Sequence, residues 1–265
     1  MIRLIATDLD GTLLNNEHKI SDYNKKIISA INEKGIKFIL STGRPTSAAT
    51  KFLEDLNIET DMISFNGAMI TDRKGNILYE DNLESHIGKE LIEIAKKYKV
   101  YYQGFLGERW NLSDSKSKWL DFYISIAKIN NYKLGFDNIK DFSFSKFMFI
   151  GENHILKEIA KEIDKKLKDK VYYTFSRPVY LEVHSPKVSK ANALSFLLKK
   201  YNIERENIMA FGDNNNDIEM LELAKISVAV ENAESIVKEK AKYITKSNIE
   251  NGVGYFINEY FNLGL

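Results

Sequence analysis

The sequence lacks cysteine altogether and has few histidines. Without cysteine the chain forms no disulfide bond, offers no thiolate ligand to zinc and has no cysteine nucleophile. Its four histidines are scattered along the sequence, so we expect no histidine-rich metal site. Any bound metal would therefore be held by oxygen atoms, and Mg²⁺ is the ion that such ligands suggest.

A long apolar run is also missing, and so is an excess of charge of either sign. The apolar start of the chain ends at Ala6, too early for the core of a signal peptide, and no later segment is long enough to span a membrane. We therefore expect a cytoplasmic protein. The formal net charge of +1 gives no general attraction to nucleic acid or to an anionic membrane, so neither is expected as a partner.

The sequence does contain many apolar residues, arranged in short segments. They make up 44% of the 265 residues, enough for one large core or two smaller ones. In the first 80 residues, runs typical of buried parallel strands alternate with helical patterns. Strands are predicted at 2–7, 36–40 and 61–65, helices at 22–34 and 46–56, and a hairpin at 68–71 and 77–80.

The pattern changes in the middle of the chain and then returns. Helices are predicted at 86–98, 116–129 and 155–167, and strands at 100–105, 110–112, 146–151, 171–175 and 179–184. After Pro186 the earlier alternation resumes. The predicted fold class is α/β: a doubly wound, Rossmann-like parallel sheet from residues 1–82 and 188–265, with residues 83–187 as an inserted α+β cap domain.

Two carboxylates follow the first predicted strand directly. Asp8 and Asp10 lie two residues apart, so strand geometry predicts that their side chains leave its end side by side. Carboxylates that close repel each other and favour a nearby cation or a shared proton. The alternative is an ordinary turn, because Asp and Gly are common turn residues.

Two further polar clusters stand at corresponding positions. Thr42 follows the second strand, and Asp213 with Asp217 follows the strand predicted at 207–211. Because the carboxyl ends of parallel strands share one edge of a sheet, where ligands bind, these groups should converge in space. Three such clusters on one edge are difficult to explain as turns alone.

The converging groups suit phosphoryl transfer. A carboxylate such as Asp8 can attack phosphorus and form an aspartyl phosphate. Asp8 and Asp213 are suited to hold Mg²⁺, and the role of donor to the phosphoryl oxygens is open to Thr42 and Lys190. Asp10 is suited to protonate the leaving oxygen and then to activate water.

At these positions the sequence resembles the haloacid dehalogenase superfamily of phosphohydrolases. The first motif of that family is matched by Asp8-Leu9-Asp10-Gly11-Thr12, and the later motifs, in the right order, by Ser41-Thr42-Gly43-Arg44, by Lys190 and by Gly212-Asp213-Asn214-Asn215-Asn216-Asp217. The resemblance covers the whole chain. The large insertion looks like the α/β cap of the Cof-type branch, many of whose members dephosphorylate sugar phosphates and related metabolites.

The resemblance implies roles around the metal. Asp8 is then the nucleophile and a Mg²⁺ ligand, and Asp10 is the general acid/base, whose backbone carbonyl also binds the metal. Asp213 is a direct metal ligand. Asn216 and Asp217 orient the waters of the metal or the motif lysine.

The resemblance also implies a phosphate-binding set. Thr42, Gly43 and Lys190 bind the phosphoryl group, and Lys190 restrains the charge on Asp8. The family often has glycine after this lysine, whereas Ala191 follows it here. This is a mild change within a helix.

Four further residues are possible substrate contacts, each with a simpler alternative. Arg44 would grip substrate or close the site, or else form a surface ion pair. Asn66 would contact substrate, or only shape a turn. Glu182 and His184, two apart on a predicted strand, would face the leaving group of the substrate or form a solvated edge pair.

We therefore predict a Mg²⁺-dependent phosphatase that hydrolyses a small phosphorylated metabolite, such as a sugar phosphate or similar phosphomonoester, through an aspartyl phosphate on Asp8. The cap is expected to open for substrate and close to exclude water. A phosphohexomutase is one alternative, distinguished by isomerised product instead of free phosphate. A non-catalytic metabolite-binding regulator is another, but it has no need of the pair Asp8 and Asp10. A receiver-like protein phosphorylated on Asp8 is disfavoured by Asp10 and by the inserted domain.

Overall fold

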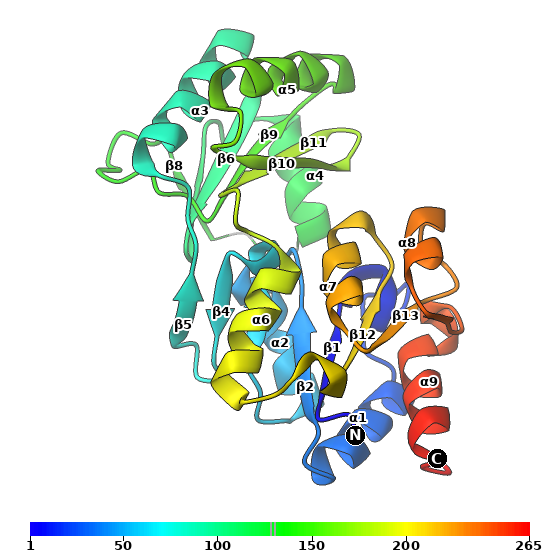
Figure 1. The fold of residues 1–265 in the computed structure, drawn as a ribbon. Helices are drawn as coiled ribbons and strands as arrows, with labels where there is room; N and C mark the ends of the chain where they lie inside the picture. The colour runs from blue at the N-terminus through cyan, green and yellow to red at the C-terminus, as the bar shows by residue number, and fades with distance from the viewer. Residues whose placement is uncertain (128, 130) are drawn as a thin grey trace. The chain divides into compact units, whose positions relative to one another are not determined.

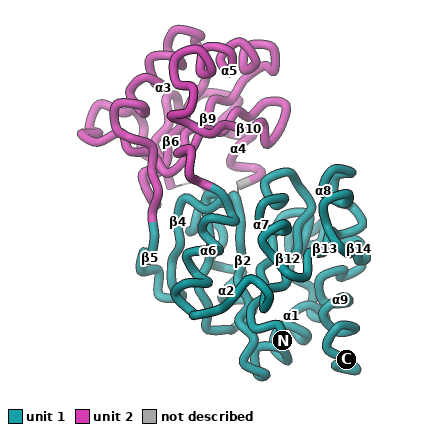
Figure 2. The backbone as a smooth tube through the Cα atoms, in the orientation of Figure 1, with its two compact units in different colours: residues 1–79, 189–265 teal, residues 80–188 magenta. Residues whose placement is uncertain are grey.

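The chain folds into two compact units. The structure, a computed structural model, describes residues 1–127, 129 and 131–265. Residues 1–79 and 189–265 form one unit, here called the core unit, and residues 80–188 form the inserted unit (Figure 2). The predicted α/β class with a parallel-sheet core is confirmed.

The core unit is built on an open eight-stranded sheet (Figure 1). Its strands are, in spatial order, β14 (Tyr243–Ile244), β13 (Ile226–Ala229), β12 (Ile208–Gly212), β1 (Leu4–Thr7), β2 (Lys37–Ser41), β3 (Met62–Ser64), β4 (Met69–Thr71) and β5 (Ile77–Glu80). The pairs from β14 to β3 are parallel, and β3 pairs with β4 in the antiparallel sense. The chain winds outward in one direction through β2 and β3 and in the other through β12 to β14. The switch point, where such sheets bind ligands, therefore lies between β1 and β12.

Helices cover both faces of this sheet because its strands are apolar on both sides. One face is covered by α1 (Asp22–Glu33), α2 (Thr46–Leu56) and α9 (Gly252–Phe261). The other face is covered by α6 (Lys190–Tyr201), α7 (Ile218–Leu223) and α8 (Ser235–Lys240). Alternate residues of β1 serve the two layers: Ile5 packs in the first, Leu4 and Ala6 in the second. The sequence thus specifies a doubly wound sheet.

Two serines begin helices in the core unit, as the sequence predicts. The side chain of Ser21 accepts a hydrogen bond from the backbone N–H of Asn24 at the start of α1. Ser189 accepts one from Asn192 at the start of α6. Each satisfies a backbone donor that the first turn of a helix leaves unpaired. The cap at Ser189 fixes where Lys190 enters its helix.

The inserted unit has its own sheet and its own core. In spatial order its strands are β10 (Tyr172–Arg177), β11 (Tyr180–His184), β9 (Lys146–Ile150), β6 (Tyr101–Leu106), β7 (Arg109–Leu112) and β8 (Tyr132–Leu134). Neighbouring strands are antiparallel, except that β7 and β8 are parallel. Helices α3 (Ser85–Tyr98) and α5 (Asn153–Leu167) share one apolar core with strands β9 and β11.

Two differences from the predicted elements occur in the inserted unit. Strand β8 was not predicted, and two of its three residues are exposed. Helix α4 spans Lys118–Ala127, whereas the sequence predicts a helix over 116–129; residue 128 of that prediction lies outside the described residues. Within the described ranges, no helix is both long and apolar enough to cross a membrane.

Candidate active site

A buried lysine joins two carboxylates at the end of β1. The Nζ of Lys190 donates to Oδ1 of Asp8 at 2.5 Å and to Oδ1 of Asp217 at 2.7 Å. The side chains of Lys190 and Asp217 are fully buried. Burial alone would lower the pKa of Lys190, but the charges of Asp217 and Asp8 raise it above its ordinary value. The lysine is therefore charged.

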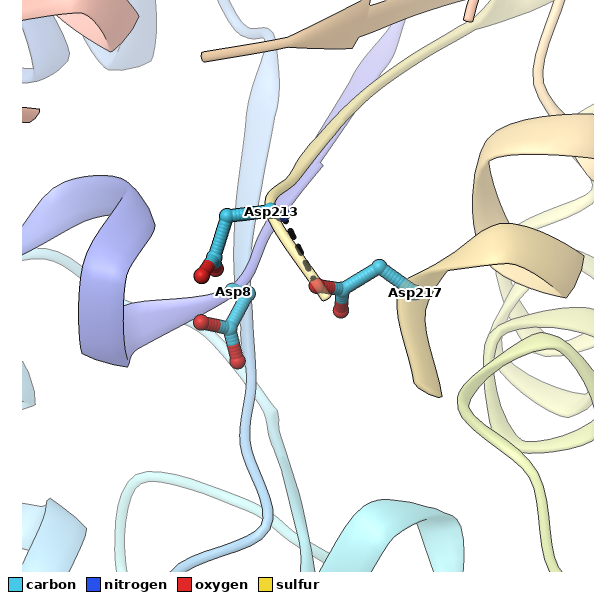
Figure 3. A group of neighbouring side chains, drawn as sticks. All are labelled: Asp8, Asp213 and Asp217. Atoms are coloured by element: carbon cyan, nitrogen blue, oxygen red, sulfur yellow. Dashed lines mark hydrogen bonds between the residues drawn. The ribbon is translucent and has the colours of Figure 1, made fainter. Parts of the chain in front are cut away.

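The loop after β12 brings a third carboxylate to the same place. Oδ2 of Asp217 accepts hydrogen bonds from the backbone N–H groups of Asp213 and Asn214 at 3.0 and 3.1 Å, which closes the loop. Figure 3 shows the first of these bonds, with the carboxylates of Asp213 and Asp8 beside each other. Oδ1 of Asp213 accepts from the hydroxyl of Thr12 at 2.6 Å. One oxygen each of Asp8, Asp213 and Asp217 lie within 4.8 Å of one another.

The electrostatics of this cluster suit a cation. Burial, and the neighbouring charges of Asp217 and Asp213, raise the pKa of Asp8 well above its ordinary value, although Lys190 opposes this. Burial and the charge of Asp217 raise the pKa of Asp213 to about 6. One lysine thus balances only part of the charge of three carboxylates, and a hard divalent cation would balance the rest.

Asp8 and Asp213 are better placed than Asp217 to bind such a cation. Both oxygens of Asp217 already accept hydrogen bonds. Asp8 and Asp213 each use one oxygen in this way in the described hydrogen bonds. The donor set consists of carboxylate oxygens, which are the ligands that Mg²⁺ prefers. The residues therefore fit this metal.

Asp10 has a different partner. Nε and Nη2 of Arg44 donate to its two carboxylate oxygens, both at 2.6 Å. Arg44 thus forms an ion pair, as its simpler interpretation expects, but a partly buried one: its side chain is 11% exposed and that of Asp10 is 44% exposed. Burial opposes ionisation, but the hydrogen bonds and charge of Arg44 outweigh it and lower the pKa of Asp10.

The turn after β1 carries both Asp8 and Asp10. Strand β1 ends at Thr7, and Leu9–Leu13 forms one distorted turn of π-helix. Both carboxylates therefore belong to the turn that follows the strand, where they have different partners but remain close enough that, besides burial, the charge of Asp10 raises the pKa of Asp8. Gly11 has φ +85°, and a Cβ there would lie 2.4 Å from Oδ2 of Asp213, so this close approach requires glycine.

The ends of β2 and β3 contribute a second group of contacts. Thr42 is buried, and its hydroxyl accepts from the backbone N–H of Arg44 at 3.1 Å. Asn216 Nδ2 donates to Oδ1 of Asn66 at 2.9 Å. A Cβ at Gly43 would lie 2.7 Å from that same oxygen, so Gly43 allows Asn66 to approach. Asn66, predicted as a turn residue or a substrate contact, thus connects two loops of the site. Of the two residues expected to orient the metal's waters or Lys190, Asp217 contacts Lys190, whereas the described hydrogen bond of the Asn216 side chain is to Asn66.

Glu182 and His184 belong to the inserted unit and make their contacts there. Strand β11 lies between β10 and β9, and both side chains are buried, so they do not form the solvated edge pair considered from the sequence. Lys146 Nζ lies 2.6 Å from Oε2 of Glu182, and Ser176 donates to Oε1 at 2.7 Å. Nδ1 of His184 donates to the carbonyl of Ser145 at 3.1 Å. Burial opposes ionisation, but Lys146 lowers the pKa of Glu182 to about 2.

Sequence reasoning missed a further loop at this edge, the one after β13. Asn232 Nδ2 donates to the carbonyl of Gly11 at 2.8 Å, and the backbone N–H of Glu234 donates to the carbonyl of Asp213 at 2.9 Å. The hydroxyl of Thr12 was also given no role, although it binds Asp213. Polar residues directly after an apolar strand were the signal used for the other loops, and the segment after Val230 carries the same signal.

Fold and site together define an α/β phosphohydrolase with carboxylates at the switch point of an open sheet. The sequence profile of the haloacid dehalogenase-like hydrolase family matches residues 5–257, and the chain belongs to this family. It is therefore a phosphoric monoester hydrolase of that family, as the sequence predicts.

Two curated relatives and one solved structure illustrate the similarity. The chain is 34% identical to the 5-amino-6-(5-phospho-D-ribitylamino)uracil phosphatase YcsE of Bacillus subtilis (strain 168), over 98% of this chain and 96% of that protein. It is 31% identical to YwtE of the same organism, which has the same activity in its name, over 97% and 98%. The crystal structure of a haloacid dehalogenase-like hydrolase from Bacteroides thetaiotaomicron matches with a TM-score of 0.90 and 29% identity, over 98% of this chain and 100% of that one.

Proposed function

We propose that this phosphatase depends on Mg²⁺ and forms an aspartyl phosphate on Asp8. The observation that carries the proposal is the pairing of Lys190 with Asp8 and Asp217, next to Asp213. A buried carboxylate held by one lysine is fixed in position for attack, and the neighbouring carboxylates supply ligands for the metal.

The proposed reaction has two steps. A carboxylate oxygen of Asp8 bonds to phosphorus, the bond to the leaving oxygen breaks, and Asp10 gives that oxygen a proton. Water then attacks the phosphorus of the aspartyl phosphate and gives a proton to Asp10. The bond between phosphorus and Asp8 breaks, so phosphate is released and the Asp8 carboxylate is restored. Asp8 and Asp213 would hold Mg²⁺, which would supply positive charge for the phosphoryl oxygens. Lys190 and Thr42 donate to the same oxygens.

Arg44 governs which form Asp10 takes in this scheme. The bidentate pair keeps Asp10 ionised, which is the form that accepts a proton from water. For the first step Asp10 must carry a proton, so we propose that the pair with Arg44 opens when substrate binds and that Asp10 then takes up a proton from solvent. Arg44 is then released toward the anionic substrate.

We propose a small phosphorylated metabolite as substrate. Both named relatives act on a molecule in which a phosphate stands at the end of a ribityl chain. A sugar or polyol phosphate of similar chemistry is the class we propose here, and we assign its selection to the inserted unit, residues 80–188.

The test is phosphate release from a panel of metabolites, with Mg²⁺ and after full chelation. The panel contains sugar phosphates, pyridoxal phosphate, flavin-related phosphates and 5-amino-6-(5-phospho-D-ribitylamino)uracil. We expect release that requires Mg²⁺ from at least one sugar or polyol phosphate. Undiminished activity after chelation would contradict the metal assignment, and isomerised sugar phosphate without free phosphate would favour the mutase.

A further inference from the structure

Three asparagine side chains hold the backbone of the turn that carries Asp10. Asn232 Nδ2 donates to the carbonyl of Gly11 at 2.8 Å. Asn248 Nδ2 donates to that of Leu14 at 2.8 Å, and Asn24 Nδ2 to that of Leu13 at 3.4 Å. These amides therefore bind the turn from outside, at three nearby carbonyls.

Two of these asparagines also bind each other. Oδ1 of Asn232 accepts the backbone N–H of Asn248 at 2.8 Å. Asn232 follows β13, and Asn248 begins the short 3₁₀ turn Asn248–Glu250. The two bonds of Asn232 thus connect the turn after β1 to a segment more than two hundred residues later. Neither the loop of Asn232 nor the segment of Asn248 carries a residue with a proposed chemical role.

The turn needs such support because its backbone is irregular. Asp10 has φ −79° and ψ 116°, and Gly11 has φ +85°, so the turn departs from helical angles at both residues. The bond from the N–H of Leu14 to the carbonyl of Leu9, at 2.9 Å, closes it. Carbonyls that such a turn cannot pair internally need donors from elsewhere.

We propose that Asn232 and Asn248 are positioning residues for Asp10. They fix the backbone on the C-terminal side of Asp10, and so the place from which its carboxyl reaches the leaving oxygen. This inference rests on the proposed function, because it requires Asp10 to be the general acid. A misplacement of about 1 Å in a catalytic group can lower a rate about a hundredfold.

Two other roles are open to Asn232 and predict different results. If it only stabilises the fold, its loss lowers activity toward all substrates alike. Because Asn232 is exposed, it is also accessible for direct contact with substrate, and its loss would then raise KM while leaving kcat in place. A positioning role instead lowers kcat, most strongly where the leaving group needs protonation.

The experiment compares two kinds of leaving group. p-Nitrophenolate departs without protonation, whereas an alkoxide needs a general acid, so the contribution of Asp10 to kcat/KM is large only for alkyl phosphates. kcat and KM are measured for p-nitrophenyl phosphate and for the best alkyl phosphate of the panel. The variants are Asn232→Ala, Asn248→Ala and Asn232→Asp, the last of which keeps the acceptor for the N–H of Asn248 but removes the donor to Gly11.

Asn207→Ala is the matched control. Asn207 Nδ2 donates to the carbonyl of Met1 at 2.7 Å. The control therefore removes the same kind of amide-to-carbonyl bond before the start of β1, away from the turn that follows β1. Thermal melting shows whether each variant is folded.

We expect kcat/KM for the alkyl phosphate to fall at least about tenfold further than that for p-nitrophenyl phosphate in the Asn232 and Asn248 variants, with KM nearly unchanged. The Asn207 variant should match the unaltered enzyme. An equal fall with both substrates, a rise in KM alone or no change would each overturn the inference. An unaltered enzyme that releases no phosphate would instead contradict the proposed function.

Discussion

Arg44 binds both carboxylate oxygens of Asp10 through Nε and Nη2, each bond 2.6 Å long. Asp8, two residues earlier, is bound by Lys190 at 2.5 Å. Two carboxylates that are close in sequence thus have separate cationic partners: the planar guanidinium of Arg44 for Asp10 and the buried ammonium of Lys190 for Asp8. Burial and the neighbouring carboxylates raise the pKa of Asp8, whereas Arg44 lowers that of Asp10 in spite of its burial.

Arg44→Lys tests the bidentate pairing of Arg44 with Asp10. Lysine keeps the positive charge but cannot bind both oxygens of Asp10 in one plane, so the carboxyl loses its fixed orientation. We expect kcat/KM with the best substrate to fall about tenfold or more while the fold persists. Arg73→Lys is the control, since Arg73 pairs with the exposed Glu59. Equal activity of the two variants would show that the Arg44 pair has no part in the reaction.

Lys190→Met tests the buried ammonium. The change leaves Asp8 and Asp217 without their cation, and breaking a buried pair in this way costs about 3–5 kcal/mol of unfolding free energy. We expect urea unfolding to show a loss of this size, with phosphatase activity close to zero. Added Mg²⁺ should stabilise the variant more than the unaltered chain, because more uncompensated charge remains.

Lys200→Met provides a matched comparison on the same helix. Lys200 Nζ binds Oδ2 of Asp61 at 2.6 Å, away from the cluster, and the lysine is 37% exposed. Because the hydroxyl of Tyr201 also donates to the buried Asp61, that carboxylate keeps a partner, so the loss of Lys200 should cost less stability than the loss of Lys190 and leave activity in place. A smaller loss for Lys190→Met than for Lys200→Met would contradict the role given to the buried pair.

Mg²⁺ should stabilise the folded chain through Asp8 and Asp213. A ligand that binds only the folded state adds about 2.7 kcal/mol of stability at a hundred times its dissociation constant. Melting temperature should therefore rise with Mg²⁺ concentration, and Asp213→Asn should remove most of that rise. Asp61→Asn, a buried carboxylate elsewhere in the core unit, should keep it. A rise that survives in the Asp213 variant would place the ion elsewhere.

The inserted unit should lose stability in acid through Glu182. Its folded pKa, about 2, lies below the ordinary value of 4.5, so the pair with Lys146 stabilises fully above pH 4.5. That contribution is lost as the pH falls from about 4.5 toward 2, because the unfolded chain takes up the proton first. Glu182→Gln should lower the unfolding free energy by about 3–5 kcal/mol at pH 7, and by progressively less in acid.

Tryptophan fluorescence can follow this transition, because both tryptophans of the chain, Trp110 and Trp119, lie in the inserted unit. Replacing the pair by apolar residues, as Glu182→Leu with Lys146→Met, should recover most of the loss. A difference between Glu182→Gln and the unaltered chain that stays constant from pH 7 to pH 2.5 would contradict the assignment.

Local signals made much of the fold predictable. Helix α2 has the predicted bounds, 46–56, because its apolar spacing and the proline before it are features of the segment itself. Ser21 and Ser189 begin helices as predicted, because an N-cap depends on neighbouring residues. Strand β8 carries no such signal: it has three residues and pairs only at the end of its sheet.

The candidate site was predictable in its residue types more than in its contacts. That Asp8, Lys190 and Asp213 share one edge follows from the alternation of strands and helices. The pairing of Arg44 with Asp10 depends on the irregular turn after β1, which no periodicity reveals. The bond from Asn232 to the turn joins residues 221 positions apart, and only the folded chain brings them together.

The most direct test of the account is chemical trapping of the phosphorylated enzyme. A single turnover with ³²P-labelled substrate is stopped in acid, the chain is digested, and the labelled peptide is identified by mass spectrometry. We predict label on Asp8 that forms before free phosphate appears, and no label in Asp8→Asn, which should still fold. Label on another residue, or release of phosphate at full rate by Asp8→Asn, would contradict the central claim.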